Sequence, residues 1–278
     1  MKIKKAIMVA TILMTLVIFC YWQNNDISIT NIDFTNNKVP DNFNDYKMLQ
    51  ISDLHNKEFG KNQNKLVKLT KKINPDVIVV TGDLIDSRRT NIDIGIDYMS
   101  QAVKIAPTYY VPGNHESRID EYGKLENILS KEGIKILNND SEIIKINNQE
   151  ITLLGMKDIS FINAGNKQKQ FSSILSNLKN ESNDNLTILL SHRPELIDIY
   201  ANHNIDLVFT GHAHGGQIRL PFIGGLLSPG QGLLPKYTSG IYEKDNTKMI
   251  VSRGLGNSLF PFRIFNRPEL IVTTLKSE

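Results

Sequence analysis

Five short segments of this chain carry the side chains that could do chemistry, and each segment follows an apolar run. The side chains in question are Asp53, His55, Asp83, Asn114, His115, His192, His212 and His214. Imidazole nitrogens together with carboxylate and amide oxygens suit divalent ions such as Mn, Fe and Zn. Five of the six histidines fall in these segments, and only His203 lies elsewhere. The pattern therefore predicts metal-dependent chemistry.

Taken one at a time, these residues have ordinary structural explanations. Asp83 after a Thr-Gly pair could cap a turn or helix, and Asn114 after Pro-Gly could be a turn residue. His192 could be a histidine at a helix entry. His212 and His214 could share one strand face or form a loop pair. Their joint occurrence favours a site, because buried imidazoles and carboxylates grouped together are costly without a cation.

The elements that must position these side chains are short apolar strands and amphipathic helices. From residue 46 onward, runs rich in Val and Ile do not alternate with polar residues, which is typical of strands buried on both faces. Helical spacing occurs between several of these runs, for example at Leu66, Leu69 and Ile73. Residues 26 to about 45 are expected to form an edge strand and a loop. This order predicts an α/β fold with helices outside a parallel or mixed sheet, and ligands at the carboxyl ends of its strands.

The composition excludes some classes of protein. The chain has 278 residues, of which 40% are hydrophobic and 22% are charged, as in a folded globular protein. The net charge of +3 is too small to favour nucleic acid as the main partner. Cys20 is the single cysteine, so the fold depends on its core or on metal rather than on an intrachain disulfide.

The N-terminus differs from the rest of the chain. Three lysines in the first five residues precede the uncharged run Ala6–Trp22. As a helix, these 17 residues span about 26 Å, close to a hydrocarbon core of roughly 30 Å. No small-residue cleavage site ends the run, so we expect a signal anchor over residues 1–25 rather than a cleaved signal. Phe19 argues against lipoprotein processing at Cys20. A buried core helix is the alternative.

The order of motifs D-x-H, GD, GNHE, H and GHxH resembles the calcineurin-like metallophosphoesterases. The later segments GHAHGGQIRLP, LPKYTSGIY, SRGLGNS and RPEL resemble a membrane-associated bacterial phosphodiesterase branch of that family. The resemblance implies a layered α-β-β-α sandwich of mixed sheets with helices outside. It also implies a catalytic domain over residues 26–278, after the transmembrane segment. The positive charges before that segment place this domain outside the cytoplasm, on the cell membrane.

The resemblance further implies a role for each site residue. One ion would be held by Asp53, His55 and His214. The other would be held by Asn114, His192 and His212, and Asp83 would bridge the two ions. Such a pair lowers the pKa of a shared water, which attacks phosphorus in line. Asn114 and His115 are the expected catalytic residues, with His115 as proton donor to the leaving group. Glu116 stands where many relatives have an aspartate that orients this histidine.

The expected activity is hydrolysis of a phosphate ester, with a diester favoured and a lipid-linked ester as one option. The alternatives are a non-catalytic, metal-stabilised scaffold at the membrane and a nuclease or nucleotide phosphatase. The sequence gives little support for a nucleic-acid substrate, because the chain lacks a stripe of aromatic and basic residues. Arg88, Arg89, Arg118 and Arg193 could contact phosphate or be solvated. The apolar loop over residues 219–237 could line a lipid groove, touch the bilayer or pack on the sheet.

Overall fold

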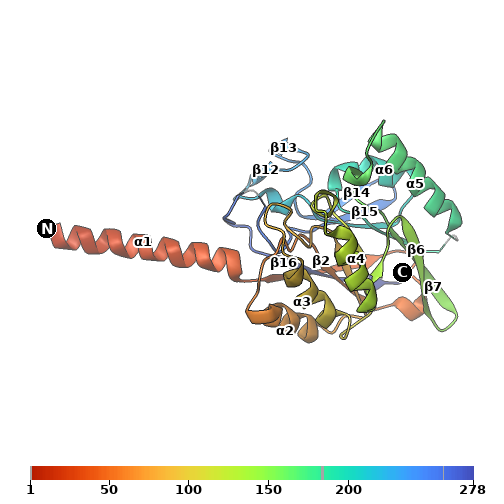
Figure 1. Ribbon diagram of the computed structural model, residues 1–278, viewed down its shortest axis with the longest axis horizontal. Coiled ribbons are helices and arrows are strands. Elements are labelled where there is room, and N and C mark those ends of the chain that lie inside the picture. The colour runs from red at the N-terminus through yellow and green to blue at the C-terminus, as the bar shows by residue number, and fades with distance from the viewer. Residues whose placement is uncertain (1, 183–184, 259) are drawn as a thin grey trace.

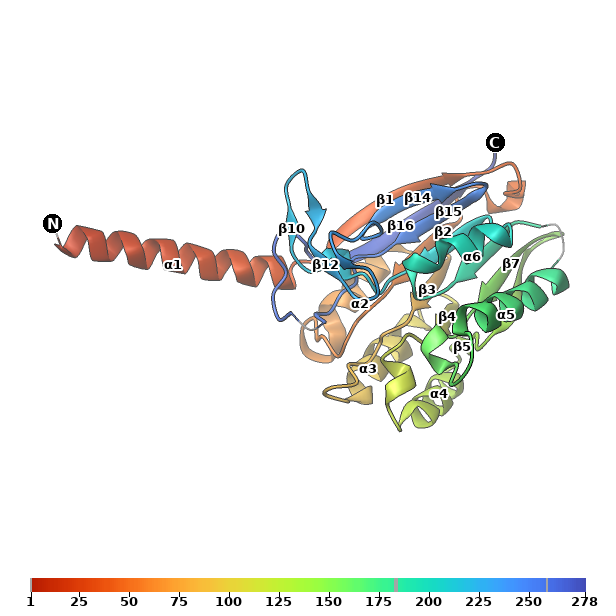
Figure 2. The same ribbon diagram turned by 90° about the horizontal axis from the view of Figure 1, so that it is seen from above.

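Two six-stranded mixed sheets lie face to face, and helices cover their outer sides (Figure 1, Figure 2). The computed structural model describes residues 2–182, 185–258 and 260–278. A single long helix leaves one end of this sandwich. The layered α-β-β-α arrangement predicted from the sequence is confirmed.

The first sheet has the strand order β1-β16-β2-β3-β4-β5. Its strands are β1 (Ser28–Thr35), β2 (Lys47–Ile51), β3 (Val77–Thr81), β4 (Thr108–Val111), β5 (Lys135–Ile136) and β16 (Glu269–Lys276). Strands β2 to β5 run parallel, and β16 pairs antiparallel with β2. β1 lies at the edge, parallel to β16, as its sequence predicts.

The second sheet has the order β14-β15-β9-β8-β7-β6. Its strands are β6 (Asp140–Ile146), β7 (Gln149–Gly155), β8 (Thr187–Leu190), β9 (Leu207–Thr210), β14 (Gly240–Lys244) and β15 (Thr247–Val251). The four central strands β7, β8, β9 and β15 are parallel, and the two outer pairs are antiparallel. Two small hairpins interrupt the chain after β9. They are formed by β10 (Arg219–Leu220), β11 (Gly224–Gly225), β12 (Leu227–Ser228) and β13 (Gly232–Leu233).

Three apolar layers hold the sandwich together. On β3, Val77 and Val79 face the other sheet, whereas Ile78 and Val80 face the outer helices, which is the alternation of a strand buried on both sides. The helices outside the first sheet are α2 (Asn64–Ile73), α3 (Ile92–Ala102) and α4 (Tyr122–Lys131), and those outside the second are α5 (Lys167–Glu181) and α6 (Ile197–Asn202). Short 3₁₀ turns occupy Asp41–Phe43, Lys61–Gln63, Glu116–Arg118, Ile159–Phe161, Pro194–Leu196 and His214–Gly216.

The N-terminal helix α1 (Lys2–Asn25) projects away from the sandwich (Figure 1). Its most apolar 18-residue window has a mean hydropathy of 2.1, and none of that window is buried in the protein. Only its last two turns pack on the domain, where Gln23 and Asn24 are buried and Phe19 is half-buried. The alternative of a buried core helix is therefore wrong, and α1 is a candidate membrane span.

Candidate metal centre

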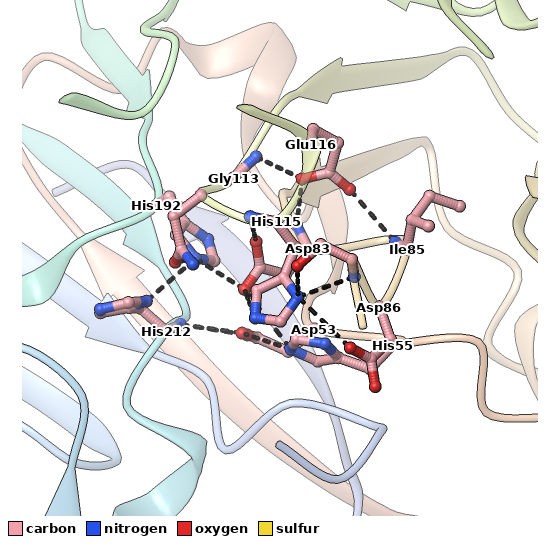
Figure 3. Close-up of polar contacts among 12 residues, drawn as sticks. Asp53, His55, Asp83, Ile85, Asp86, Gly113, His115, Glu116, His192 and His212 are labelled. Carbon is pink, nitrogen blue, oxygen red and sulfur yellow. Dashed lines mark hydrogen bonds and ion pairs between the residues drawn. The ribbon is translucent and has the colours of Figure 1, made fainter. Parts of the chain in front are cut away.

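The candidate site lies just beyond the carboxyl ends of β2, β3, β4, β8 and β9 (Figure 3). Five of its side chains come from residues with left-handed backbone, namely Asp53 (φ 52°), His55 (φ 47°), Asp83 (φ 51°), His212 (φ 63°) and His214 (φ 48°). Such a conformation costs a non-glycine residue about 1–3 kcal/mol and is found where surrounding structure enforces it, often at active sites. Five strained residues at one edge of the two sheets therefore mark this edge as functional.

Two glycines let the loops after β3 and β4 touch. Gly82 has a φ of 87°, and a Cβ there would lie 2.6 Å from the backbone of Gly113. A Cβ on Gly113 would lie 2.3 Å from Oδ1 of Asp83. Because no side chain separates them, the two loops bring Asp83 and Asn114 to the same point.

The first cluster contains Asp53, His55, Asp83 and His214, all buried. Nε2 of His55 lies 3.1 Å from Nε2 of His214 and 3.4 Å from Oδ2 of Asp83. Nε2 of His214 lies 3.3 Å from Oδ1 of Asp53. Two nitrogens and two carboxylates thus converge on one point, which is the ligand mix of a divalent ion site.

The second cluster contains Asp83, His192 and His212, with Asn114 beside them. Nε2 of His192 lies 3.2 Å from Oδ2 of Asp83, 3.1 Å from Oδ1 of Asn114 and 3.2 Å from Nδ1 of His212. The same oxygen of Asp83 therefore faces both clusters. His212 and His214 lie beyond the end of β9 as a loop pair, not on a shared strand face, and they enter different clusters.

The hydrogen bonding of His192 tests whether a cation fits. Its Nδ1 lies 2.7 Å from the carbonyl oxygen of Thr81, so Nδ1 carries the proton and Nε2 presents a lone pair. That lone pair faces the oxygens of Asp83 and Asn114, which are acceptors, and Nδ1 of His212. In the first cluster, Nδ1 of His55 and of His214 has no hydrogen-bond partner among the described residues. Carboxylate and amide oxygens grouped with imidazole nitrogens in this way fit a positive ion.

The titration of these groups points the same way. Burial opposes protonation of His192, but the neighbouring Asp83 raises its pKa to about 10. Burial likewise opposes protonation of His55, but hydrogen bonds to Asp53 and Asp83 raise its pKa to about 9. Burial would raise the pKa of both carboxyl groups, yet the histidines hold it well below its usual range. The clusters therefore favour positive charge between their carboxylates, which a metal ion provides.

His115 is held differently from the other histidines. Its Nδ1 accepts the backbone N–H of Ser87 at 3.0 Å, so the ring proton is on Nε2. The Ser87 hydroxyl lies 3.1 Å from the same nitrogen. Burial lowers the pKa of His115 to about 4. The ring is thus neutral near pH 7, and it carries a proton on Nε2, 3.9 Å from Oδ2 of Asp83.

Glu116 contributes to the site through the backbone. Its buried carboxylate accepts N–H groups from Gly113 (2.8 Å), Asp83 (3.0 Å) and Ile85 (3.2 Å) (Figure 3). Burial, reinforced by Asp83, raises its pKa to about 7. It joins the loops after β3 and β4, whereas Ser87 holds the ring of His115. The orienting role suggested by resemblance therefore belongs to Ser87, a residue without a motif signal in the sequence.

A cavity of about 250 Å³ opens over the two clusters. Arg88, Arg118 and Arg193 line it, whereas Arg89 does not. Arg193 is anchored by buried Asp158 through bonds of 2.7 and 3.2 Å, a partner that the sequence did not indicate. Pro229, Gly230 and Ser258 also line the cavity.

Two other residues lie outside the reacting groups. Ser191, next to His192, is buried and bonds the hydroxyl of Tyr200 at 2.8 Å. His203 lies at the end of α6, where its ring bonds Ser172 at 2.9 Å. Neither residue belongs to either metal cluster.

Comparison with known proteins finds similar sequences and a similar fold. The sequence profile described as calcineurin-like phosphoesterase matches residues 46–216. Phosphodiesterase YaeI of Escherichia coli is 27% identical, with 84% of each chain covered. A Bos taurus "transmembrane protein with metallophosphoesterase domain" is 26% identical over 90% of this chain and 57% of its own length. The crystal structure of TT1561 of Thermus thermophilus has a TM-score of 0.52 at 16% identity, covering 76% of this chain and 90% of that one.

Proposed function

The chain belongs to the calcineurin-like phosphoesterase family, and from this premise we propose that it is a two-metal phosphodiesterase anchored in a membrane. Its membership makes it a metal-dependent phosphoesterase, a hydrolase of ester bonds, with buried His and Asp clusters able to hold metal ions. The number of ions, the diester preference and the anchoring are the parts that we propose.

The position of Asp83 carries the two-metal proposal. One of its oxygens lies 3.4 Å from a nitrogen of the first cluster and 3.2 Å from a nitrogen of the second. Asp83 would bridge the ions. Asp53, His55 and His214 would complete one site, and Asn114, His192 and His212 the other. Two divalent ions, Mn, Fe or Zn, would supply an activated water and offset charge on the phosphoryl oxygens.

The remaining residues of the cavity have roles that follow from their protons and charges. Nε2–H of His115 would donate a hydrogen bond to the oxygen of the leaving group, and the negative charge of a bound phosphate would favour the imidazolium form that can pass on a proton as the ester bond breaks. Asn114 positions the phosphate group beside it. Arg193, held by Asp158, together with Arg118 binds phosphoryl oxygens. No serine nucleophile is required.

Metal reconstitution of the full-length protein tests this proposal. The protein in lipid nanodiscs is stripped with a chelator, reloaded with Mn²⁺, and assayed on bis(p-nitrophenyl) phosphate and p-nitrophenyl phosphate. We expect two bound ions and faster hydrolysis of the diester. Asp83→Asn should lose at least one ion and roughly 10²–10³-fold in rate, whereas exposed Asp198→Asn should lose neither. A folded, metal-loaded protein without turnover would instead support the non-catalytic scaffold.

A leaving-group comparison tests His115 separately. An alkoxide needs a proton as it leaves, whereas p-nitrophenolate does not. His115→Ala should therefore slow hydrolysis of an alkyl diester by about 10²-fold or more, with a much smaller effect on the nitrophenyl diester. Equal losses on both substrates would contradict the role of proton donor.

We propose that residues 1–25 form an uncleaved anchor and that residues 26–278 form the catalytic domain outside the cytoplasm. The last turn of α1 supports this, because Asn24 accepts the backbone N–H of Arg263 at 3.0 Å and is buried in the domain. Cleavage after Asn25 would remove this contact. A lipid-linked phosphodiester, rather than nucleic acid, is the substrate that an anchored enzyme of net charge +3 would meet.

A further inference from the structure

We propose that an apolar rim beside α1 docks on the lipid bilayer, so that the catalytic cavity opens at the membrane surface. The rim consists of the hairpins over residues 219–234 and the loop over residues 260–265. Its exposed side chains include Phe222, Ile223, Leu233, Leu234, Phe262 and Phe265. The inference rests on the proposed membrane span of α1.

The rim side chains are not packed on the domain. Phe222 is fully exposed, Leu233 is 81% exposed and Leu234 is 66% exposed. Contiguous apolar surface of this kind marks a contact with a membrane or a partner. The alternative that this whole loop packs on the sheet is therefore wrong for these residues.

The rim lies where α1 leaves the domain. Both views place the hairpins on the side from which the helix projects (Figure 1, Figure 2). The ring of Phe19 contacts that of Phe265 with centroids 5.5 Å apart. The guanidinium of Arg267 lies 5.0 Å from the ring of Trp22. The end of the apolar helix and the rim are thus one continuous surface.

The length of the helix brings the rim to the lipid. The uncharged run Ala6–Trp22 spans about 26 Å, whereas a hydrocarbon core is roughly 30 Å thick. The next residues, Gln23 and Asn24, are already buried in the domain, so no linker separates the span from the domain. A short span without a linker places the domain directly on the interface, where exposed apolar side chains would otherwise face water.

The charge of the rim fits a bilayer better than a protein of mixed charge. Residues 215–240 include Arg219 and Lys236 and contain no acidic residue. Residues 251–268 contain no acidic residue, but of their three arginines Arg253 and Arg267 are paired with Glu269 and Asp26, and Arg263 is buried. The rim segments therefore present no acidic side chain that would repel anionic headgroups, and the exposed Lys236 can attract them.

The rim also forms part of the cavity wall. Pro229 and Gly230, between β12 and β13, line the cavity over the metal clusters, as does Ser258 just before the second rim segment. A second hollow of about 550 Å³ lies between α1 and Pro261 and Phe262. A bilayer in contact with the rim would therefore present its headgroups beside the catalytic cavity.

Depth-dependent quenching in membranes tests the docking. In a Cys20→Ser background of the full-length chain, Phe222→Cys and Leu233→Cys are labelled with an environment-sensitive fluorophore. Ile143→Cys on β6, at an exposed apolar position away from the rim, is the matched control. The proteins are reconstituted in vesicles with anionic lipid and nitroxide-labelled acyl chains. We expect several-fold stronger quenching at 222 and 233 than at 143.

Equal quenching at all three positions would overturn the docking. Flotation of the vesicles tests the premise separately: a chain that does not float lacks the membrane span, and the inference fails with it. Energy transfer between labelled copies at position 222, with no lipid quenching, would show a second copy on the rim and would also overturn it. None of these measurements requires hydrolysis, so failure of the proposed activity is distinguishable, and thermal melting of each variant confirms folding.

Discussion

The orientation of two side chains, Asp83 and His192, determines how the two clusters could hold metal ions. Asp83 shares one oxygen between two clusters, and the ring of His192 is fixed by the carbonyl of Thr81 so that its lone pair faces other acceptors. A hydrogen bond of this kind to the outer nitrogen of a histidine sets its orientation as a ligand. The residue types were visible in the sequence, and the family resemblance implied a bridging place for Asp83, but the bond from His192 to Thr81 was not expected.

The stability of the folded protein should depend on the length of the Glu116 side chain. Glu116→Asp moves the carboxylate back by one methylene, so it cannot keep its bonds to Gly113 and Ile85 together. Each buried N–H left without a partner costs about 1–3 kcal/mol. We expect a loss of that size in urea unfolding, with weaker metal binding. The exposed Glu121→Asp is the control, and equal stability of the two variants would contradict this role.

After metal removal, the stability of the folded protein should decrease as the pH rises. In the metal-free protein, the carboxylates overcome burial and raise the pKa of His55 to about 9 and of His192 to about 10. A histidine whose pKa is raised in the folded state stabilises that state. The stabilisation is complete below the pKa of an unfolded histidine, about 6.5, and it is lost as the pH rises through the pKa of the folded state. The melting temperature of the chelator-treated protein should therefore fall between pH 7 and pH 10. Metal-loaded protein should show a smaller fall, and a rise in the metal-free sample would refute the argument.

The strands position these side chains because they end at the same edge of the two sheets. The parallel strands β2, β3 and β4 of one sheet and β8 and β9 of the other each stop within a few residues of a candidate ligand. The loops that follow are joined across the sheets, because the backbone N–H of His212 donates to the carboxylate of Asp53. Joining the sheets at the site couples metal binding to the packing of the sandwich.

The loop after β9 has no room for a side chain at Gly211. A Cβ there would lie 1.9 Å from Oγ of Ser52 and 2.2 Å from Oδ2 of Asp53. Gly211→Ala should therefore cost about 1–3 kcal/mol in unfolding free energy and displace a ligand of the first ion. Gly123→Ala on α4 is the control, because a Cβ there meets nothing within 4 Å. Unchanged metal content in Gly211→Ala, measured by mass spectrometry, would contradict the packing argument.

The whole molecule joins a compact sandwich to an apolar helix that the sandwich does not bury (Figure 2). The last turn of α1 is part of the domain surface, through Asn24 and its contact with Arg263. The catalytic cavity and the helix are thus held in one geometry without a flexible connection.

The charges at the N-terminus predict on which side of the membrane the domain lies. The three lysines before the apolar run should keep the N-terminus in the cytoplasm and place the domain outside. Protease added to intact spheroplasts should digest a C-terminally tagged protein. Replacing Lys2, Lys4 and Lys5 with glutamate should increase the protected fraction. Protection of the unaltered protein, with digestion only after lysis, would show the opposite orientation.

Sequence by itself determined the α/β class, the strand ends and the types of ligand, because these follow from local periodicity and from the side chains that follow each apolar run, whereas the two-sheet layering was expected only from the family resemblance. Tertiary structure alone decided the partners of those side chains. Ser87 rather than Glu116 holds His115, Asp158 anchors Arg193, and the apolar hairpins stay exposed beside α1. The two contacts join loops that follow neighbouring strands of one sheet, β3 with β4 and β7 with β8, and their meeting depends on the order of strands in the sheet, which no local pattern encodes.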